Sequence, residues 1–315
     1  MIEPLSGLQI TRANQPRTYS SATRRIAAGF GLGLLLPIAY LANAVPAQAE
    51  IRFVSTIEGD HFVYLPPQPA QRILLVAHGT PRKDEPAKIN ARRYLKRWLK
   101  LADRHSLIVI SPVFDEARFG SRSQGYGGYR GLFGKHIGAD TFIDRLVGKY
   151  ARQTKSGNGR FLLYGHSAGG QFAVRYTVRY PDKVEKTVVS ASGRYSYPTT
   201  KVAWPYGAGP FRRTISWDKG KVKNTETVEP RLENYAKAVP KIAIVIGAKD
   251  TKPQPERPGH VGRTRVELAR SWASQMNRLA AKQKKPGRIK VTITPGIGHD
   301  SRKLMPYAAK ILLGD

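Results

Sequence analysis

The sequence predicts an α/β protein in which an open, mostly parallel sheet carries helices on both faces. Two observations lead to this prediction. After residue 50, short apolar runs rich in Val, Ile and Leu alternate along the chain with longer amphipathic segments. The apolar runs are continuous, as in strands that are buried on both faces, and the alternation of such strands with helices is typical of a parallel sheet between two helical layers.

Six of the apolar runs are expected to form the parallel strands. They are 72–78, 106–111, 160–165, 186–191, 241–247 and 290–296. Two earlier runs, 51–57 and 61–65, lie so close together in the chain that we expect them to form an antiparallel hairpin at the edge of the sheet.

Five amphipathic segments are expected to form the helices. They are 88–102 and, approximately, 139–153, 168–180, 261–282 and 301–312. In 88–102, apolar residues recur at steps of three and four with Arg and Lys between them. Such a basic amphipathic helix also suits a membrane surface, but the strand-like runs on both sides favour a helix that packs against the sheet.

Two long segments interrupt this alternation, and each follows a predicted strand. They are 112–138, which contains GSRSQGYGGYRG, and 192–239, which contains PYGAGPFRR. Long irregular segments in a compact domain are commonly functional. We therefore expect loop or lid insertions here that shape what the site binds.

The first 49 residues are predicted to form an export signal. Arg24 and Arg25 precede the apolar stretch 26–44, and the segment ends in Ala-Gln-Ala, the small-x-small form of a cleavage site. A transmembrane anchor is the alternative, but Pro37 and three glycines favour a cleaved signal over an uninterrupted spanning helix. The arginine pair also suits a twin-arginine route, although two small alanines follow it where bulkier apolar residues would be expected.

The expected location follows from this signal. Residues 50–315 would form the mature domain, in the periplasm or outside the cell, with no membrane span once the signal is cleaved and a membrane anchor if it is not. The compartment would be oxidising, yet the chain has no cysteine, which excludes disulfides, a thiol nucleophile and cysteine metal sites.

The chain is strongly basic. It has 53 Lys and Arg against 22 Asp and Glu, a net charge of +31, and removal of residues 1–49 takes away four Arg and one Glu, which leaves +28. This charge is expected to attract anionic neighbours, envelope components among them, or simply to form a solvated basic surface. The basic residues are spread through every segment, without zinc-finger spacing or an RNA-binding signature, so a nucleic-acid partner is not expected.

A serine between glycines is the candidate nucleophile. The pattern Gly165-His166-Ser167-Ala168-Gly169 has the G-x-S-x-G form, and it lies between a predicted strand and a predicted helix. A sharp strand-to-helix turn needs small residues on both sides of the serine, and it presents the hydroxyl at the N-terminus of the helix.

A general base and an orienting acid follow in the chain order typical of such a turn. Asp250 and His299 each come shortly after a predicted strand. Loops that follow parallel strands meet at one edge of the sheet, so Ser167, Asp250 and His299 are expected to converge. Asp300 is a weaker candidate for the acid, because neighbours in a loop point apart.

An oxyanion hole is expected beside the serine. The backbone N–H of Ala168 would be one donor, and the N–H of Thr80 or Gly79, in the loop after the strand at 72–78, would be the second. His78 is either an alternative base or, as is commoner at such a position, a residue that shapes this loop by hydrogen bonding.

Several aromatic and charged residues in the insertions are candidates to contact substrate. Tyr126, Tyr129 and Trp204 are expected substrate contacts, and Phe133 and Tyr206 could extend the same rim, with loop packing as the alternative for all of them. Asp115 and Arg118 either line the pocket or form a structural ion pair. His166 is expected to be a packed residue of the turn at Ser167. The remaining histidines lack metal-ligand spacing, and no metal site is predicted; they are His61, His105, His136 and His260.

These motifs together resemble the α/β-hydrolase superfamily. The resemblance covers about 70–313 and rests on HGT at 78–80, GHSAGG at 165–170, GAKDT at 247–251 and GIGHD at 296–300. Within the superfamily the chain is most similar to exported bacterial esterases and depolymerase-like hydrolases. The resemblance implies a Ser-His-Asp hydrolase of small or polymeric esters that needs no cofactor. One departure is HGTP in place of the HGGG form of one lipase and esterase branch.

The sequence leaves three functions open. The first is ester hydrolysis through an acyl-enzyme, and the second is acyl transfer to a sugar or lipid by the same triad. The third is a binding protein that has kept the fold without turnover, since a fold does not determine a function.

Overall fold

A computed structural model describes residues 49–120, 128–154, 159–217 and 222–314. All of them belong to one compact unit, Val45–Asp315. The predicted export segment lies outside the described residues, apart from its last position.

An eight-stranded sheet runs through the middle of this unit, in the order β1-β2-β4-β3-β5-β6-β9-β10. Its strands are β1 (Glu50–Val54), β2 (Asp60–Leu65), β3 (Arg72–Ala77), β4 (Leu107–Val113), β5 (Phe161–His166), β6 (Val184–Ser190), β9 (Ile242–Gly247) and β10 (Lys290–Thr294). The six strands from β4 to β10 are parallel, and β1 and β2 pair antiparallel at one edge. The predicted fold class and all eight predicted strands are thus confirmed.

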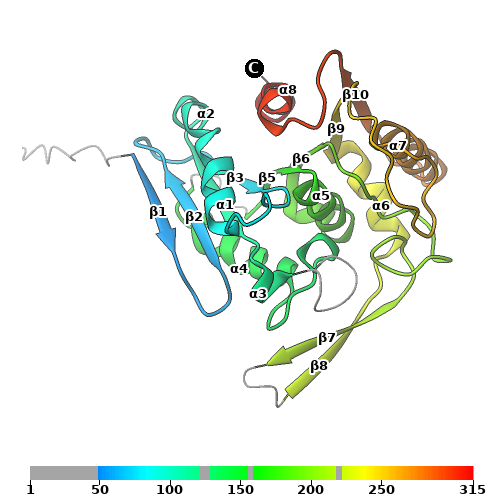
Figure 1. The fold of residues 1–315 in the computed structure, drawn as a ribbon, viewed down its shortest axis with the longest axis horizontal. Coiled ribbons are helices and arrows are strands. Elements are labelled where there is room, and N and C mark those ends of the chain that lie inside the picture. The colour runs from blue at the N-terminus through cyan, green and yellow to red at the C-terminus, as the bar shows by residue number, and fades with distance from the viewer. Residues whose placement is uncertain (1–48, 121–127, 155–158, 218–221, 315) are drawn as a thin grey trace, which may run out of the picture. The chain divides into compact units, whose positions relative to one another are not determined.

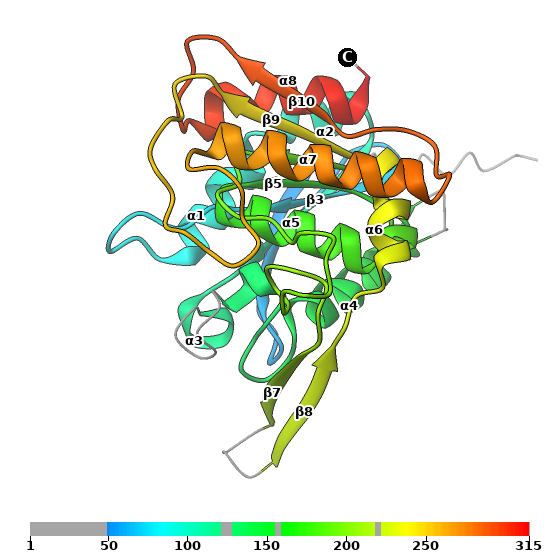
Figure 2. The same cartoon turned by 90° about the vertical axis from the view of Figure 1, so that its right-hand side faces the viewer.

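Helices cover both faces of the sheet (Figures 1 and 2). One layer consists of α1 (Ala87–Lys96), α2 (Leu99–Arg104) and α8 (Ser301–Leu313), and the other of α4 (Ala139–Ala151), α5 (Ala168–Arg179), α6 (Leu232–Ala238) and α7 (Arg265–Lys282). Each layer has its own core, because successive strand side chains point to opposite faces: Leu74 and Val76 pack under α1, and Leu75 and Ala77 pack on the opposite face.

The segment 88–102 differs in detail from its prediction. It forms two helices, α1 and α2, with a break at Arg97 and Trp98. Tyr94 and Trp98 are buried against the sheet, so this amphipathic segment faces the core rather than a membrane surface.

The two insertions contain regular structure that the sequence did not predict. The first holds the short helix α3 (Glu116–Phe119) and a 3-10 turn, η2 (Gly128–Gly131). The second holds the hairpin β7 (Phe211–Trp217) and β8 (Val222–Val228), a separate two-stranded sheet that extends away from the large one, followed by α6 (Figure 1). The strand sequences FRRTISW and VKNTETV are mostly polar and lack the apolar runs that mark the central strands.

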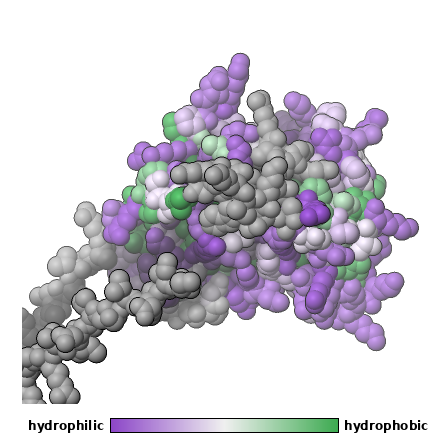
Figure 3. Space-filling view, turned by 90° about the horizontal axis from the view of Figure 1, so that it is seen from below, coloured by the Kyte–Doolittle hydropathy of each residue, from purple (hydrophilic) through white to green (hydrophobic). Residues whose placement is uncertain are grey.

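No helix in the described ranges is long and apolar enough to cross a membrane. On the face shown in Figure 3, hydrophilic side chains dominate the visible surface, and hydrophobic residues occur in small separate groups. This distribution is typical of a solvated surface.

A buried ion network joins the hairpin to the helical layer. The carboxylate of Asp140 on α4 is fully buried and lies 2.8 Å from Arg179 on α5 and 3.2 Å from Arg213 on β7. Arg213 also donates to Glu226 on β8 at 2.9 Å, and Tyr180 donates its hydroxyl to Asp140 at 2.8 Å. Two guanidinium groups therefore share one buried carboxylate.

Replacement of this carboxylate is expected to destabilise the protein strongly. Asp140→Asn leaves Arg179 and Arg213 with only the half-exposed Glu226 as a charge partner, which should lower the free energy of unfolding by about 3 kcal/mol. The control Glu185→Gln breaks a half-exposed pair with Arg72 and should cost less than about 1 kcal/mol. Urea unfolding measures both, and equal losses would contradict this account of the network.

Candidate active site

Ser167 occupies a strained turn between β5 and α5. Its backbone has φ +56° and ψ −112°, a conformation that L residues rarely adopt and that costs about 1–3 kcal/mol. Its N–H donates to the carbonyl of Ser190 at the end of β6, 2.8 Å away, and the first turn of α5 begins at Ala168. The turn is therefore held from the neighbouring strand and presents the side chain at the C-terminal edge of the sheet.

The glycines on both sides of Ser167 permit close backbone contacts. A Cβ atom at Gly165 would overlap the carbonyl oxygen of Gly169 and lie 2.9 Å from the Cβ of Ala173. A Cβ at Gly169 would overlap the carbonyl of Ala77 and lie 2.7 Å from that of His78. The structure thus confirms that positions 165 and 169 require residues without a side chain. The absence of a side chain at Gly169 also allows the close approach of α5 to the end of β3.

The structure brings Ser167, His299 and Asp250 into one hydrogen-bonded chain. The Oγ of Ser167 lies 3.0 Å from Nε2 of His299, and Nδ1 of His299 lies 2.7 Å from Oδ2 of Asp250. The loops after β9 and β10 hold the two partners together, because the N–H of Lys249 donates to the carbonyl of Ile297 at 2.8 Å.

Asp250 has a second partner that the sequence did not reveal. Its side chain is almost fully buried, and its Oδ1 accepts a hydrogen bond from Nη1 of Arg265 at 2.7 Å. Arg265 is the first residue of α7, whose start is set by a capping box between Thr264 and Glu267. Burial alone would raise the pKa of the Asp250 carboxyl, but the hydrogen bond from His299 and the charge of Arg265 outweigh it and hold the pKa below its ordinary value.

The loop after β3 lies against the serine. A Cβ at Gly79 would come within 3.4 Å of the Cβ of Ser167. The carbonyl of Gly79 accepts hydrogen bonds from His78 Nδ1 at 2.7 Å and from the Asn90 amide at 2.8 Å. In a trans peptide the N–H points opposite to the carbonyl, so the Thr80 N–H points away from these two side chains.

His78 shapes this loop and is not placed as a base. The ring is fully buried, and its Nε2 accepts the N–H of Phe114 at 3.1 Å while Nδ1 donates to Gly79. Burial lowers its pKa to about 4. His166 is likewise buried, 4.8 Å from the His299 ring between centroids, and burial lowers its pKa well below the ordinary value.

The two other carboxylates have structural contacts. Asp300 caps α8 by accepting the N–H groups of Arg302 at 2.8 Å and Lys303 at 3.2 Å, so it does not face the imidazole. Asp115 caps α3 and pairs with Arg118 at 3.4 Å, and both side chains also line a cavity, so both predicted alternatives hold for this pair.

The expected substrate contacts in the insertions are placed differently. Trp204 is fully buried, and its indole N–H donates to the carbonyl of Gly131 at 2.9 Å, so its side chain packs the two insertions together instead of forming a rim. Phe133 is fully buried as well. Tyr129 is largely buried, is stacked on Phe114 at 4.3 Å between ring centroids and lines a cavity. Tyr126 lies outside the described residues.

A cavity of about 490 Å³ opens beside Ser167 and His299. Its walls come from the loop after β3, the inner face of α1 and the start of α8. Four of the side chains that line it are arginines, and one is a carboxylate, Asp300; the arginines are Arg82, Arg93, Arg97 and Arg302.

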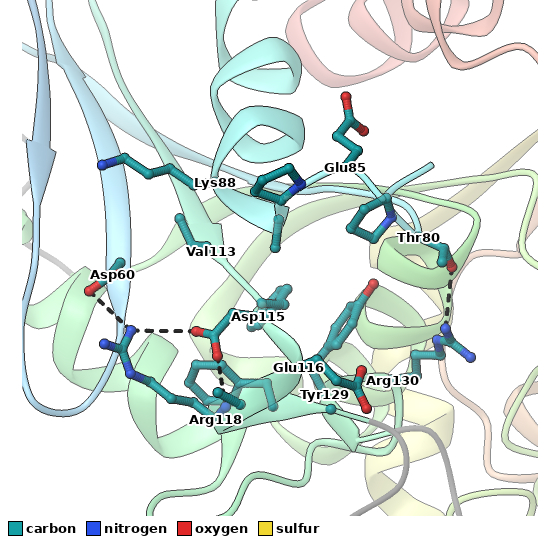
Figure 4. A pocket seen from close by; sticks show the side chains of 17 residues that line it. Asp60, Thr80, Glu85, Lys88, Val113, Asp115, Glu116, Arg118, Tyr129 and Arg130 are labelled. Carbon is teal, nitrogen blue, oxygen red and sulfur yellow. Dashed lines mark hydrogen bonds and ion pairs between the residues drawn. The ribbon is translucent and has the colours of Figure 1, made fainter. Parts of the chain in front are cut away.

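A second cavity, of about 500 Å³, adjoins the first at Thr80 (Figure 4). On the side of Thr80, the guanidinium of Arg130 donates to the threonine hydroxyl at 3.2 Å. On the other side, Arg118 lies 3.0 Å from Asp60 and closes the cavity toward β2. Ser167 thus lines the cationic cavity, and the cavity of mixed lining begins on the other side of Thr80.

Within the part of the chain that the structure describes, no three His, Asp or Glu side chains are grouped so that they could hold a metal ion.

Sequence reasoning missed Arg265, Arg97 and Arg302. None of them belongs to a local motif, and each comes to the site through helix packing: Arg97 at the end of α1, Arg265 and Arg302 at the starts of α7 and α8. With 53 basic residues in the chain, nothing in the pattern distinguishes these three.

Two solved structures are similar to this chain over nearly their whole length. One is a poly(3-hydroxybutyrate) depolymerase from Bordetella parapertussis, with 22% identity and a TM-score of 0.65 over 85% of this chain and 90% of that one. The other is poly(aspartic acid) hydrolase-1 from Sphingomonas sp. KT-1, with 21% identity and a TM-score of 0.64 over 84% of this chain and 98% of that one. The chain therefore has the α/β-hydrolase fold.

No protein-family model and no curated protein matches the sequence.

The glycine contacts at the turn predict opposite effects for two Gly→Ala changes. Gly165→Ala forces a methyl group into the carbonyl of Gly169 and should lower the unfolding temperature markedly. Gly148→Ala, in the middle of α4 with open space around it, should stabilise the protein by about 0.5–1 kcal/mol. Thermal unfolding followed by circular dichroism measures both, and a harmless Gly165→Ala would contradict the proposed packing.

Proposed function

We propose that this protein is a serine hydrolase that cleaves carboxylic esters through an acyl-enzyme. The observation that carries the proposal is the continuous chain from Ser167 Oγ through His299 to the buried carboxylate of Asp250, built on a strained strand-to-helix turn. Nucleophile, base and orienting acid then stand in the relation that acyl transfer requires.

The first half of the proposed reaction forms the acyl-enzyme. His299 Nε2 takes the proton of Ser167 as Oγ attacks the ester carbonyl, and the tetrahedral intermediate carries its negative charge on the former carbonyl oxygen. His299 then gives the proton to the leaving alcohol oxygen as the C–O bond breaks. In the second half, water attacks the acyl-enzyme with the same base, and Ser167 is released with its proton.

Two backbone N–H groups are proposed to stabilise the oxyanion. The N–H of Ala168 lies at the N-terminus of α5, where its dipole favours negative charge. The second is the N–H of Thr80, since the hydrogen bonds to the Gly79 carbonyl orient that peptide; the N–H of Gly79 is the alternative donor on the same loop. Each such donor typically contributes about 2.7–4 kcal/mol.

Asp250 is proposed to keep the His299 ring in the productive tautomer and to stabilise the imidazolium. It acts as a carboxylate throughout, and its low pKa supports this role. Arg265 is proposed to be a positioning residue: it occupies Oδ1 of Asp250, so that Oδ2 stays aligned with Nδ1 of His299.

The substrate is proposed to be a small or polymeric ester. The two similar structures are, by name, hydrolases of polymers, which supports a polymer or its fragments as one option. We further propose, from the export signal that the sequence predicts at 1–49, that the protein acts in the periplasm or outside the cell.

Removal of the nucleophile tests the proposed reaction. Ser167→Ala should lower kcat for p-nitrophenyl acetate and butyrate by at least about 10⁴-fold, because covalent catalysis is lost. Ser274→Ala, on the exposed side of α7, is the matched control and should be as active as the wild type. Equal rates for the wild type and Ser167→Ala would refute the proposal.

Substitution of Arg265 tests its positioning role. Arg265→Gln should lower kcat about 10- to 100-fold with little change in KM, because the buried Asp250 carboxylate loses one of its two partners and the His299 ring loses its fixed orientation.

Arg265→Lys keeps the charge and should recover a large part of this loss. The control Arg270→Gln, exposed on the same helix, should match the wild type. If Arg265 served folding alone, both Arg265 variants would yield less active enzyme, but their kcat per titrated active site would equal that of the wild type.

A further inference from the structure

The cavity beside Ser167 has an excess of positive charge in its wall. Of its four arginines, only Arg93 forms an ion pair with a carboxylate: it donates two hydrogen bonds to Glu85, at 2.6 and 2.7 Å. Arg82 and Arg302 are exposed, and their charges help to lower the pKa of Glu85 and of Asp300, respectively. None of the ion pairs among the described residues includes Arg82, Arg97 or Arg302.

The one carboxylate in the cavity wall, Asp300, caps α8 and keeps its negative charge. Asp300 accepts the backbone N–H groups of Arg302 and Lys303 at the start of α8. The neighbouring His166 adds no charge, because burial lowers its pKa well below neutrality. Four guanidinium groups therefore stand against one carboxylate in this cavity wall, and Arg97 is half-buried there without an ion-pair partner among the described residues.

Arg97 is held in place for such a role. Its Nη1 donates to the hydroxyl of Ser301 at 2.7 Å, and its guanidinium lies over the ring of Tyr94, 4.6 Å from the centroid. This leaves other N–H groups of the guanidinium for a ligand, in a plane that suits a carboxylate. Arg302 follows one residue after Ser301, so both arginines stand on the His299 side of the cavity.

The position of the cavity next to His299 indicates which part of the substrate it binds. His299 must return its proton to the leaving oxygen, so the leaving group has to lie next to Nε2 of His299. The residues that flank His299 in the cavity are Asp300, Ser301 and Arg302, with Arg97 bonded to Ser301. Arg97 and Arg302 therefore face the leaving group of the ester.

We propose that the leaving group of the substrate carries a carboxylate that binds Arg97 and Arg302, so that the enzyme cleaves esters of hydroxy acids at their hydroxyl. This inference rests on the proposed function. Water and the ester give the free acyl acid and the hydroxy acid: the acyl C–O bond breaks, the alcohol oxygen receives the proton from His299, and the carboxylate of the hydroxy acid is unchanged.

The size of the cavity agrees with this substrate class. About 490 Å³ is at the small end of ligand pockets and accommodates a short hydroxy acid. A chain of hydroxy acids joined by esters has its free carboxylate next to its last ester bond, so the arginines select the carboxyl end of such a chain. The net charge of +31 also raises the local concentration of anionic substrates around the protein.

Paired substrates test the proposal. The first pair is 3-acetoxybutanoate and its neutral amide, 3-acetoxybutanamide, which differ only in the charge of the leaving group. The wild type should prefer the carboxylate about 10- to 100-fold in kcat/KM, measured by acetate release, because two charge-assisted hydrogen bonds are added. The second pair, monoethyl succinate and its neutral amide, has the charge on the acyl side and should show no preference that depends on Arg97 or Arg302.

Variants locate the origin of the preference. In Arg97→Gln and Arg302→Gln the ratio of the two kcat/KM values should fall several-fold, and in the double variant it should approach 1. Arg92→Gln and Lys303→Gln remove equal charges from exposed neighbours on the same helices, and both should keep the wild-type ratio. Raised salt should reduce the contribution of the exposed Arg302 more than that of the half-buried Arg97.

The failure of this proposal is distinct from failure of the proposed function. If neither pair is hydrolysed and p-nitrophenyl esters are not either, the hydrolase assignment is wrong. If the esters are hydrolysed but the carboxylate has no advantage over the amide in the first pair, the leaving-group proposal is wrong. It is also wrong if the advantage survives unchanged in the double variant, because the preference then comes from the overall charge.

Discussion

The site depends on one set of backbone contacts around the turn at Ser167. Ser167 has a positive φ, and two contacts stabilise this conformation: the hydrogen bond from its N–H to the carbonyl of Ser190, and the close packing of Gly165 against the carbonyl of Gly169. The same Gly169 allows the end of β3 to approach α5, and this approach carries the Thr80 loop to the serine. Nucleophile and both proposed oxyanion donors are therefore positioned by contacts that a single methyl group would prevent.

The arginines of this basic protein are not only a solvated surface. One group is buried and holds the fold together, as Arg213 does with Asp140. Arg265 donates a hydrogen bond to Asp250, the acid of the proposed triad, and Arg97 and Arg302 line the cavity beside Ser167. Arginines thus occur in the interior, next to the proposed triad and on the surface.

The sequence predicted what is encoded locally. Central strands are recognisable because each is a continuous apolar run, and Ser167, Asp250 and His299 because each follows such a run in a fixed order.

The hairpin β7–β8 was missed because its strands are mostly polar. The segment 88–102 was predicted as one helix because the break at Arg97 and Trp98 leaves the apolar periodicity intact. Trp204 was misplaced because an aromatic residue in an insertion has the same local appearance in a core as on a rim. Arg265 could not be found, since its contact with Asp250 depends on how α7 packs.

The most direct test of the central claim is mass spectrometry of the wild-type protein after incubation with a fluorophosphonate, which reacts with activated serines. We expect a single adduct, located by peptide mapping to Ser167, and none after replacement of His299 by alanine. An unlabelled protein, or an adduct on another serine, would contradict the assignment of Ser167 as the nucleophile.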